Sequence, residues 1–177
     1  MPRDALQLID YLPCVPDFPK PGVMFRDISP LIADPQAFQF SITKFSELAS
    51  KIDFTHILAI ESRGFIFGAA LANYLGKPLL LARKPNKLPL VTHSQAYGLE
   101  YGQDALEIQA SLIPEQSSIL LIDDVIATGG TMLAAIALMS NAGAKASGAI
   151  SLLEIEALGG NRQLIGRGIS AQSILSV

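Results

Sequence analysis

The chain has no tryptophan, a single cysteine and two histidines among its 177 residues. Because one cysteine cannot form an internal disulfide, the composition is typical of a protein from a reducing compartment. Cys14, His56 and His93 also provide too few thiolate and imidazole ligands for a structural zinc site. Half of the residues are hydrophobic, so we expect the fold to rest on one compact core.

Charge is scarce as well. Charged residues make up 16% of the chain and the net charge is −3, so the basic surplus that a broad nucleic-acid surface needs is missing. No apolar run approaches the roughly 18 residues that span a bilayer, and the amino terminus shows no signal-peptide pattern. We expect a single domain over residues 1–177, soluble and cytoplasmic, with neither nucleic acid nor a membrane as partner.

Strand and helix patterns alternate along most of the chain. Asp34-Pro35 is typical of a helix start, and apolar spacing predicts an amphipathic helix over 35–51. The sequence further predicts strands at 57–60, 79–82, 118–122 and 146–153, and helices at 65–75 and 131–141. This alternation predicts an α/β fold with a central, mostly parallel sheet flanked by helices. Ligands of such sheets bind at the carboxyl ends of strands, here the loops after Ile60, Ala82 and Ile122.

Two segments do not follow this alternation. Residues 12–34 carry five prolines, so we expect them to be extended and irregular, after a short helix over 3–11. Residues 83–103 are polar and irregular, and their end is expected to pair with 105–110 in a hairpin. A structureless loop of this length in a compact domain is more often functional than decorative.

The most informative stretch is Asp123-Asp124-Val125-Ile126-Ala127-Thr128-Gly129-Gly130-Thr131, which follows an apolar strand. Glycines and bare N–H groups at a helix start favour a phosphate, whereas the two carboxylates suit hydroxyl donors or a hydrated metal. A sugar phosphate with vicinal hydroxyls would use both kinds of group. The stretch is neither a Walker loop nor a dinucleotide fingerprint. On spacing alone, a tight turn with solvated acids fits equally well.

This stretch resembles the signature of the type I phosphoribosyltransferases, which bind 5-phosphoribosyl-1-pyrophosphate (PRPP). It is most similar to the branch of that family that acts on adenine, and the resemblance extends over roughly residues 12–157. The resemblance implies the type I phosphoribosyltransferase fold, with a small N-terminal hood over about 1–34 and a flexible lid loop over about 83–103. It also implies that Asp123, Asp124 and residues 127–131 hold the ribose and phosphate of PRPP or AMP.

The resemblance assigns the pyrophosphate of PRPP to two other loops. Ser62, Arg63 and Gly64 follow the first strand of the sheet and match the family's pyrophosphate loop. The basic run that contains Arg83, Lys84 and Lys87 matches the start of the family's lid, whose cations close over the pyrophosphate. Without the resemblance, an arginine at a helix start is usually a solvated surface residue, and a basic run is usually a solvated charge cluster.

The resemblance also places the base and the catalytic groups. Leu99-Glu100-Tyr101-Gly102 is similar to the family's catalytic segment, which makes Glu100 the proton acceptor or donor near the base, alongside Arg63 as a catalytic residue. The proline-rich entry is similar to the base-binding hood, where Phe25 stacks on the purine and the backbone near Phe25 and Arg26 reads its edge. Taken alone, Glu100 would be a surface acid and Phe25 a core aromatic.

The implied reaction joins adenine and PRPP to give AMP and pyrophosphate, in purine salvage, in a homodimeric enzyme. Mg²⁺ would arrive with PRPP, and no direct protein ligand is expected beyond water-mediated contacts of Asp123 and Asp124. The 6-oxopurine branch carries a lysine where this chain has Glu154-Ile155-Glu156, which favours adenine. Two alternatives stay open: a phosphoribosyltransferase for another base, such as xanthine or a pyrimidine, and a non-catalytic regulator that senses PRPP.

Overall fold

The computed structural model describes residues 7–99 and 102–177. The chain divides into two compact units, Met1–Lys44 and Phe45–Val177, and helix α2 (Pro35–Ala49) crosses from the first into the second. In the described part, no helix is long and apolar enough to cross a membrane.

The N-terminal unit contains an antiparallel ribbon of β1 (Cys14–Pro16) and β2 (Met24–Arg26), which agrees with the extended chain expected there. The short helix α1 (Ser29–Ala33) was not predicted, because the density of prolines argued against any helix. Pro30 lies in the first turn of α1, where its missing N–H leaves no hydrogen bond unmade. The described part of the predicted N-terminal helix is a 3-10 turn over Leu8–Tyr11.

The start of α2 is the one that the sequence predicted. The Asp34 Oδ1 atom accepts the backbone N–H of Gln36 at 2.9 Å and that of Ala37 at 2.8 Å. These bonds satisfy two of the four donors that a helix start leaves open, as expected of an N-cap aspartate.

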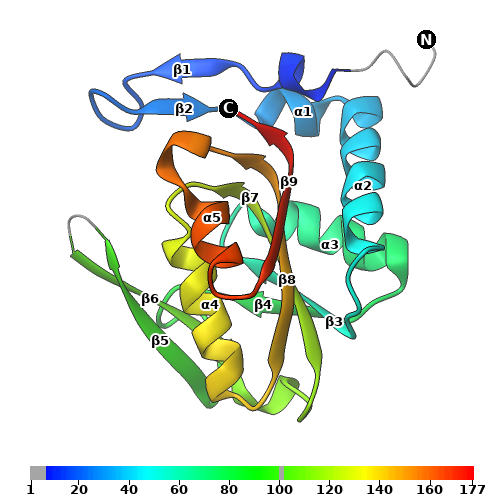
Figure 1. Ribbon diagram of the computed structural model, residues 1–177, viewed down its shortest axis with the longest axis vertical. Helices are drawn as coiled ribbons and strands as arrows, with labels where there is room; N and C mark the ends of the chain where they lie inside the picture. The colour runs from blue at the N-terminus through cyan, green and yellow to red at the C-terminus, as the bar shows by residue number, and fades with distance from the viewer. Residues whose placement is uncertain (1–6, 100–101) are drawn as a thin grey trace. The chain divides into compact units, whose positions relative to one another are not determined.

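The second unit is built on a five-stranded sheet whose neighbouring strands are all parallel, in the order β4-β3-β7-β8-β9 (Figure 1). The strands are β3 (His56–Ile60), β4 (Leu79–Ala82), β7 (Ser118–Ile126), β8 (Lys145–Glu154) and β9 (Ser170–Ser176). The predicted fold class is confirmed. Strand β7 continues past the predicted end at 122, because its pairing with β8 extends as far as Ile126 opposite Glu154.

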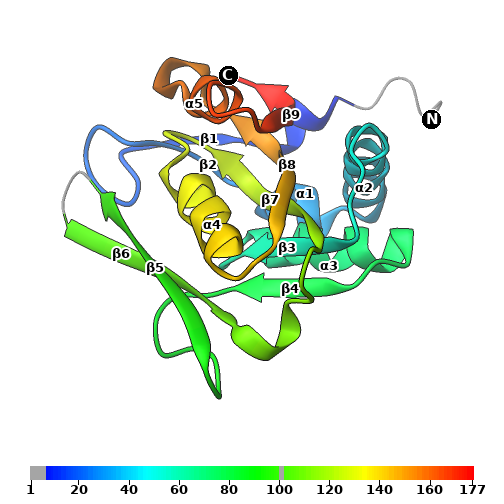
Figure 2. The same ribbon diagram turned by 60° about the horizontal axis from the view of Figure 1, so that its bottom comes forward.

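Helices cover both faces of this sheet (Figure 2). Helix α3 (Gly64–Leu75) packs on β3, β4 and β7, whereas α4 (Gly130–Asn141) packs on β7 and β8, and α5 (Gly160–Ile165) packs on β9. The connection after β3 leads outward to β4, and the connection after β7 leads the other way to β8. The chain therefore diverges at the carboxyl ends of β3 and β7, the switch point at which sheets of this kind bind ligands.

The predicted lid loop is largely a β-hairpin. Strand β5 (Thr92–Leu99) pairs with β6 (Gly102–Gln109) from Thr92 opposite Gln109 to Leu99 opposite Gly102. The expected hairpin is confirmed, but the segment 83–103 is more regular than expected, because strand pairing already begins at Thr92. The physical reason lies on β6, where Leu106 and Ile108 alternate with polar residues and are buried in the same core cluster as α4.

Helix α3 approaches the sheet closely at Gly68, which is buried. A Cβ atom at this position would lie 2.5 Å from the Cβ of Ala59 on β3 and 3.1 Å from the Cγ2 of Ile122 on β7. Real Cβ atoms do not approach so closely, so only glycine lets the helix pack at this depth.

We expect Gly68→Val to lower the free energy of unfolding by about 2–3 kcal/mol, because overpacking displaces α3 from the sheet. The neighbouring Ala69 is exposed on the same helix. Ala69→Val is therefore the matched control and should cost only about 0.5 kcal/mol of helix propensity. Urea unfolding followed by circular dichroism measures both losses, and equal losses would show that the glycine is not required for packing.

Candidate active site

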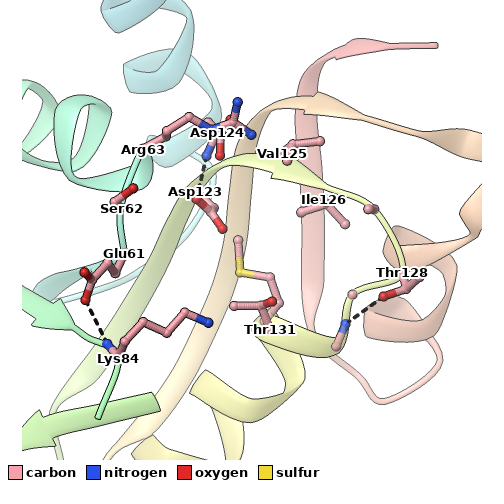
Figure 3. Close-up of a pocket in the computed structure, with 14 residues that line it drawn as sticks. Glu61, Ser62, Arg63, Lys84, Asp123, Asp124, Val125, Ile126, Thr128 and Thr131 are labelled. Carbon is pink, nitrogen blue, oxygen red and sulfur yellow. Dashed lines mark hydrogen bonds and ion pairs between the residues drawn. The ribbon is translucent and has the colours of Figure 1, made fainter. Parts of the chain in front are cut away.

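A cavity of about 340 Å³ opens at the switch point (Figure 3). All three loops to which the strand pattern pointed contribute to its walls: the turn after β3, the segment after β4, and the end of β7 with the first turn of α4. The lining residues are Glu61, Ser62, Arg63, Lys84, Asp123, Asp124, Val125, Ile126, Ala127, Thr128, Gly129, Gly130, Thr131 and Met132. The structure therefore brings together most of the side chains that the sequence singled out.

The two carboxylates lie within β7 rather than in a loop after it, so they point in different directions, as neighbours on a strand do (Figure 3). Asp124 is 5% exposed, and its Oδ2 atom lies 2.8 Å from the Nη2 atom of Arg63. The Oδ1 atom of Asp123 accepts the backbone N–H of Asp124 at 2.8 Å. Arg63, predicted to hold pyrophosphate, is thus anchored at the cavity by the second acid of the pair.

Burial disfavours the charged form of both acids. Burial and the adjacent Asp124 carboxylate raise the pKa of Asp123 well above its ordinary value. The pKa of Asp124 is also raised by burial, although the Arg63 guanidinium opposes that effect. A buried acid beside a half-buried one, both with raised pKa values, is expensive for the folded state, which is typical of a functional site.

The turn that opens α4 exposes backbone amides to the cavity. Gly129 has a φ of 84°, in the left-handed region that favours glycine, and the first helical hydrogen bond runs from Leu133 N–H to Gly129 C=O at 2.9 Å. The N–H groups of the first turn before Leu133 therefore lack helical partners, and that of Gly130 has a long contact of 3.5 Å with the Thr128 Oγ1 atom. Such a helix start attracts an anion.

The turn after β3 contains a residue whose role the sequence did not reveal. Glu61 lines the cavity and accepts the backbone N–H of Lys84 at 2.8 Å and the Nε of Arg83 at 3.2 Å. Its burial raises the pKa, but these hydrogen bonds and the nearby Arg83 and Lys87 charges outweigh burial and lower the pKa below its ordinary value. Glu61 thus joins the turn after β3 to the root of the hairpin. Its place directly after a predicted strand was the only signal in the sequence.

Lys84 is the one residue of the predicted lid cations that lines the cavity. Its Nζ atom contacts the Asp104 carboxylate and lies 2.8 Å from the Tyr97 hydroxyl, which in turn donates to Asp104 at 3.1 Å. Desolvation would lower the pKa of Lys84, but its bonds to Asp104 and Tyr97 raise it overall. Lys84 is therefore held at the cavity wall as a cation by two residues of the hairpin that sequence reasoning missed.

Several predicted site residues do not line the cavity. Arg83 is turned to Glu61 and donates its Nη1 to the Lys87 C=O at 3.1 Å, and the exposed Lys87 lies outside as well. Gly64 is buried, and a Cβ there would lie 2.8 Å from the Oδ1 of Asp123. Its role in the structure is therefore close packing of α3 on β7.

The predicted base-binding residues and the predicted catalytic acid are not among the residues described above. Phe25 and Arg26 belong to the N-terminal unit, where the Phe25 ring lies edge-on to Phe18 at 5.0 Å and Arg26 donates to the Leu12 C=O at 3.0 Å. Glu100 and its neighbour Tyr101 lie outside the described residues. The roles of Phe25, Arg26 and Glu100 stay predictions.

We expect Asp123→Asn to be more stable than the unmodified protein at pH 7, because it removes a partly desolvated carboxylate whose pKa is raised. A raised pKa means that the folded state binds the proton more tightly than the unfolded state. The destabilisation therefore grows as pH rises from about 4 through the raised pKa, and the advantage of the variant should vanish below about pH 4. Melting temperatures between pH 3.5 and 8 measure it.

The exposed Asp53 offers a control that changes the charge by the same amount. Asp53→Asn should leave the melting temperature nearly unchanged at pH 7, since Asp53 is exposed and lies outside the pair of acids on β7. An Asp123→Asn protein that melts below the unmodified protein at pH 7 would contradict the burial argument.

Comparison with known proteins agrees with the geometry. The chain matches the phosphoribosyl transferase domain family over residues 36–160. An adenine phosphoribosyltransferase of Polynucleobacter necessarius is 61% identical over 170 residues, which cover 96% of this chain and 99% of that protein. The crystal structure of adenine phosphoribosyltransferase from Thermoanaerobacter pseudethanolicus matches with a TM-score of 0.92 at 38% identity, covering 97% of this chain and all of that one.

A third comparison includes ligands. Adenine phosphoribosyltransferase from Saccharomyces cerevisiae, complexed with an imino-altritol bisphosphate and adenine, matches with a TM-score of 0.87 at 34% identity and covers 94% of this chain and 95% of that one. The fold that carries the switch-point cavity is thus shared with solved adenine phosphoribosyltransferases. The chain belongs to the phosphoribosyltransferase family, on its adenine phosphoribosyltransferase branch.

Proposed function

We propose that this chain transfers the phosphoribosyl group of PRPP to adenine, giving AMP and pyrophosphate. The observation that carries the proposal is the cavity in which the acids of β7 lie beside the bare amides of the α4 turn. Relatives that are named for this reaction support it, at up to 61% identity over nearly the whole chain. In the reaction, N9 of adenine forms a bond to C1 of the ribose while the bond from C1 to pyrophosphate breaks.

The 5-phosphate of PRPP fits the turn at Thr128–Thr131. The first-turn amides of α4 and the hydroxyls of Thr128 and Thr131 can donate to its oxygens, and the helix dipole favours its charge. The Asp123 carboxylate, directed into the cavity, can accept from a ribose hydroxyl. The sugar is then held at both ends. Holding the reacting groups in the right geometry supplies a large part of the rate enhancement of such a transfer.

The pyrophosphate fits the opposite side of the cavity, where Arg63 and Lys84 bring two cations. Both line the cavity, and both are held by carboxylates, Arg63 by Asp124 and Lys84 by Asp104. Cations fixed in advance stabilise the charge that builds on the leaving group without further reorganisation. Arg83 and Lys87 would join them only after a change in the hairpin root, because Arg83 is engaged by Glu61.

For the base, we infer stacking on Phe25, edge recognition by the backbone near Arg26, and proton transfer by Glu100. Adenine offers an amino group at position 6, which calls for an acceptor rather than a cation. The chain has Glu154 and Glu156 at the end of β8, where the 6-oxopurine branch carries a lysine. A site built for one hydrogen-bonding pattern rejects the other.

The donor set at the cavity fits Mg²⁺ that arrives bound to PRPP. Among residues 7–99 and 102–177, no group of three or more acidic, histidine or cysteine side chains could hold a metal alone. Asp123 and Asp124 supply the oxygen atoms that Mg²⁺ prefers, and they would hold it through its waters. When bound, the ion would neutralise charge on the pyrophosphate. A homodimeric assembly and a cytoplasmic location remain predictions.

The purified protein should form AMP and pyrophosphate from adenine, PRPP and Mg²⁺. Hypoxanthine and guanine should react at least about a hundredfold more slowly, because a mismatched hydrogen-bonding pattern leaves polar groups unpaired. Chromatographic separation of nucleotides, with pyrophosphate measured in parallel, checks both results.

Two other outcomes would overturn the proposal in different ways. Turnover of xanthine or a pyrimidine, with none of adenine, would identify a phosphoribosyltransferase for another base. Binding of PRPP with no pyrophosphate release for any base would identify a PRPP-sensing regulator.

A substitution at Gly130 can test ligand binding separately from folding. Its φ is not left-handed, and a Cβ there would meet only the Thr128 Oγ1 atom at 3.7 Å, so the fold itself tolerates alanine. We expect Gly130→Ala to keep or raise the melting temperature, since alanine favours a helix. The new methyl group would occupy the cavity, so the KM for PRPP should rise by about tenfold or more. Unchanged PRPP saturation would place the phosphate elsewhere.

A further inference from the structure

The segment Gly159–Asn161 belongs to none of the motifs described above, yet it packs against the turn at 127–129. The Gly160 N–H donates to the Ala127 C=O at 3.0 Å, and the Ile155 N–H donates to the Ile126 C=O at 3.0 Å. The ribbon of α5, which begins at Gly160, runs beside the turn that carries Thr128 (Figure 3). Backbone hydrogen bonds therefore join the C-terminal segment to the turn from the side away from the cavity.

This contact leaves no room for a side chain. A Cβ on Gly160 would lie 2.4 Å from the Ala127 carbonyl oxygen, 2.8 Å from the Gly129 nitrogen and 2.7 Å from the Ile126 Cγ2. In the other direction, a Cβ on Gly129 would meet the Cα and O of Gly160 at 3.2 Å. The backbone conformation of Gly160 is not left-handed, so the requirement at this position is space alone.

The segment is itself fixed to the sheet. The Asn161 Nδ2 donates to the Ser173 Oγ on β9 at 3.3 Å, and the Ser173 Oγ shares a hydrogen bond of 2.7 Å with the Ser151 Oγ on β8. Ser151 is fully buried. Hydrogen bonds thus connect two strands of the sheet to Asn161, and its covalent neighbour Gly160 is hydrogen-bonded to the turn.

We propose that Gly160 is a positioning residue for the phosphate of PRPP and AMP, acting through the turn at 127–129. Gly160 does not line the cavity, so it cannot contact the phosphate itself. Its backbone supports the turn from behind and fixes the direction of the amides that face the cavity. The inference rests on the proposed function, because it assumes that this turn holds the phosphate.

The test is Gly160→Ala, compared with the unmodified protein at a temperature where both are fully folded. The added methyl group must push the turn toward the cavity. We expect the KM for PRPP to rise about tenfold, because small misplacements of binding groups cost this much or more. The dissociation constant of AMP, measured by calorimetry, should rise by a similar factor. The KM for adenine should stay within about twofold, since the turn does not contact the base.

Gly148→Ala is the matched control. Gly148 is similarly crowded, since a Cβ there would lie 2.7 Å from the Ile52 Cδ1, but it lies on β8 and away from the turn. It should lower the melting temperature and leave the KM for PRPP unchanged. A rise in that KM equal to the rise in Gly160→Ala would mean that loss of stability alone is being measured, which would overturn the inference.

Asn161→Ala is a second test in case the Gly160→Ala protein does not fold. It removes the hydrogen bond from Asn161 to Ser173 without adding an atom. It should raise the KM for PRPP by about threefold with little effect on adenine. If the unmodified protein forms no AMP, the proposed function fails and the inference fails with it. If the unmodified protein is active and these variants saturate normally with PRPP, only the inference fails.

Discussion

The divergence of the chain at two adjacent strands is the constraint on which the site depends. Strands β3 and β7 are parallel neighbours, yet their connections lead to opposite edges of the sheet. The helices α3 and α4 therefore leave a crevice between them at the carboxyl ends of β3 and β7. The amino-terminal end of each helix lies beside this crevice. Arg63 comes from one side of this crevice, Asp123 and Asp124 from the other, and the amides of α4 close it. The sheet topology thus assembles the site.

Charged residues in and around the crevice are arranged in pairs, and the pairing explains how several cations can be held close together there. Arg63 is balanced by Asp124, Lys84 by Asp104 and Arg83 by Glu61. Asp123 has no such partner among the ion pairs of the described residues, and burial beside Asp124 raises its pKa. The folded state bears this electrostatic cost at the position that we propose accepts from a sugar hydroxyl, and there the proposed function conflicts with stability.

Local sequence predicted the elements and the motif, but contacts between distant residues needed the structure. Neighbouring residues are enough to predict the helix start at Asp34, the strands and the stretch of acids and glycines at 123–131. Other contacts join residues about twenty positions apart, as in the bonds from Arg83 to Glu61 and from Lys84 to Asp104. No local sequence pattern predicts such contacts. The hairpin was expected only at the end of the lid segment, because residues 92–99 are mostly polar and their pairing depends on the burial of Leu106 and Ile108 on the partner strand.

Glycines at the site illustrate why residue type alone cannot assign a role. Gly129 adopts a φ of 84°, which glycine tolerates best, and Gly160 is needed because another backbone occupies the space around it. Gly130 meets neither condition, since its surroundings are open and its φ is ordinary. In sequence the three are equivalent, and two of them are adjacent. The structure separates them, and under the proposed function Gly130, which folding does not require, is the one whose small size matters only to a molecule in the cavity.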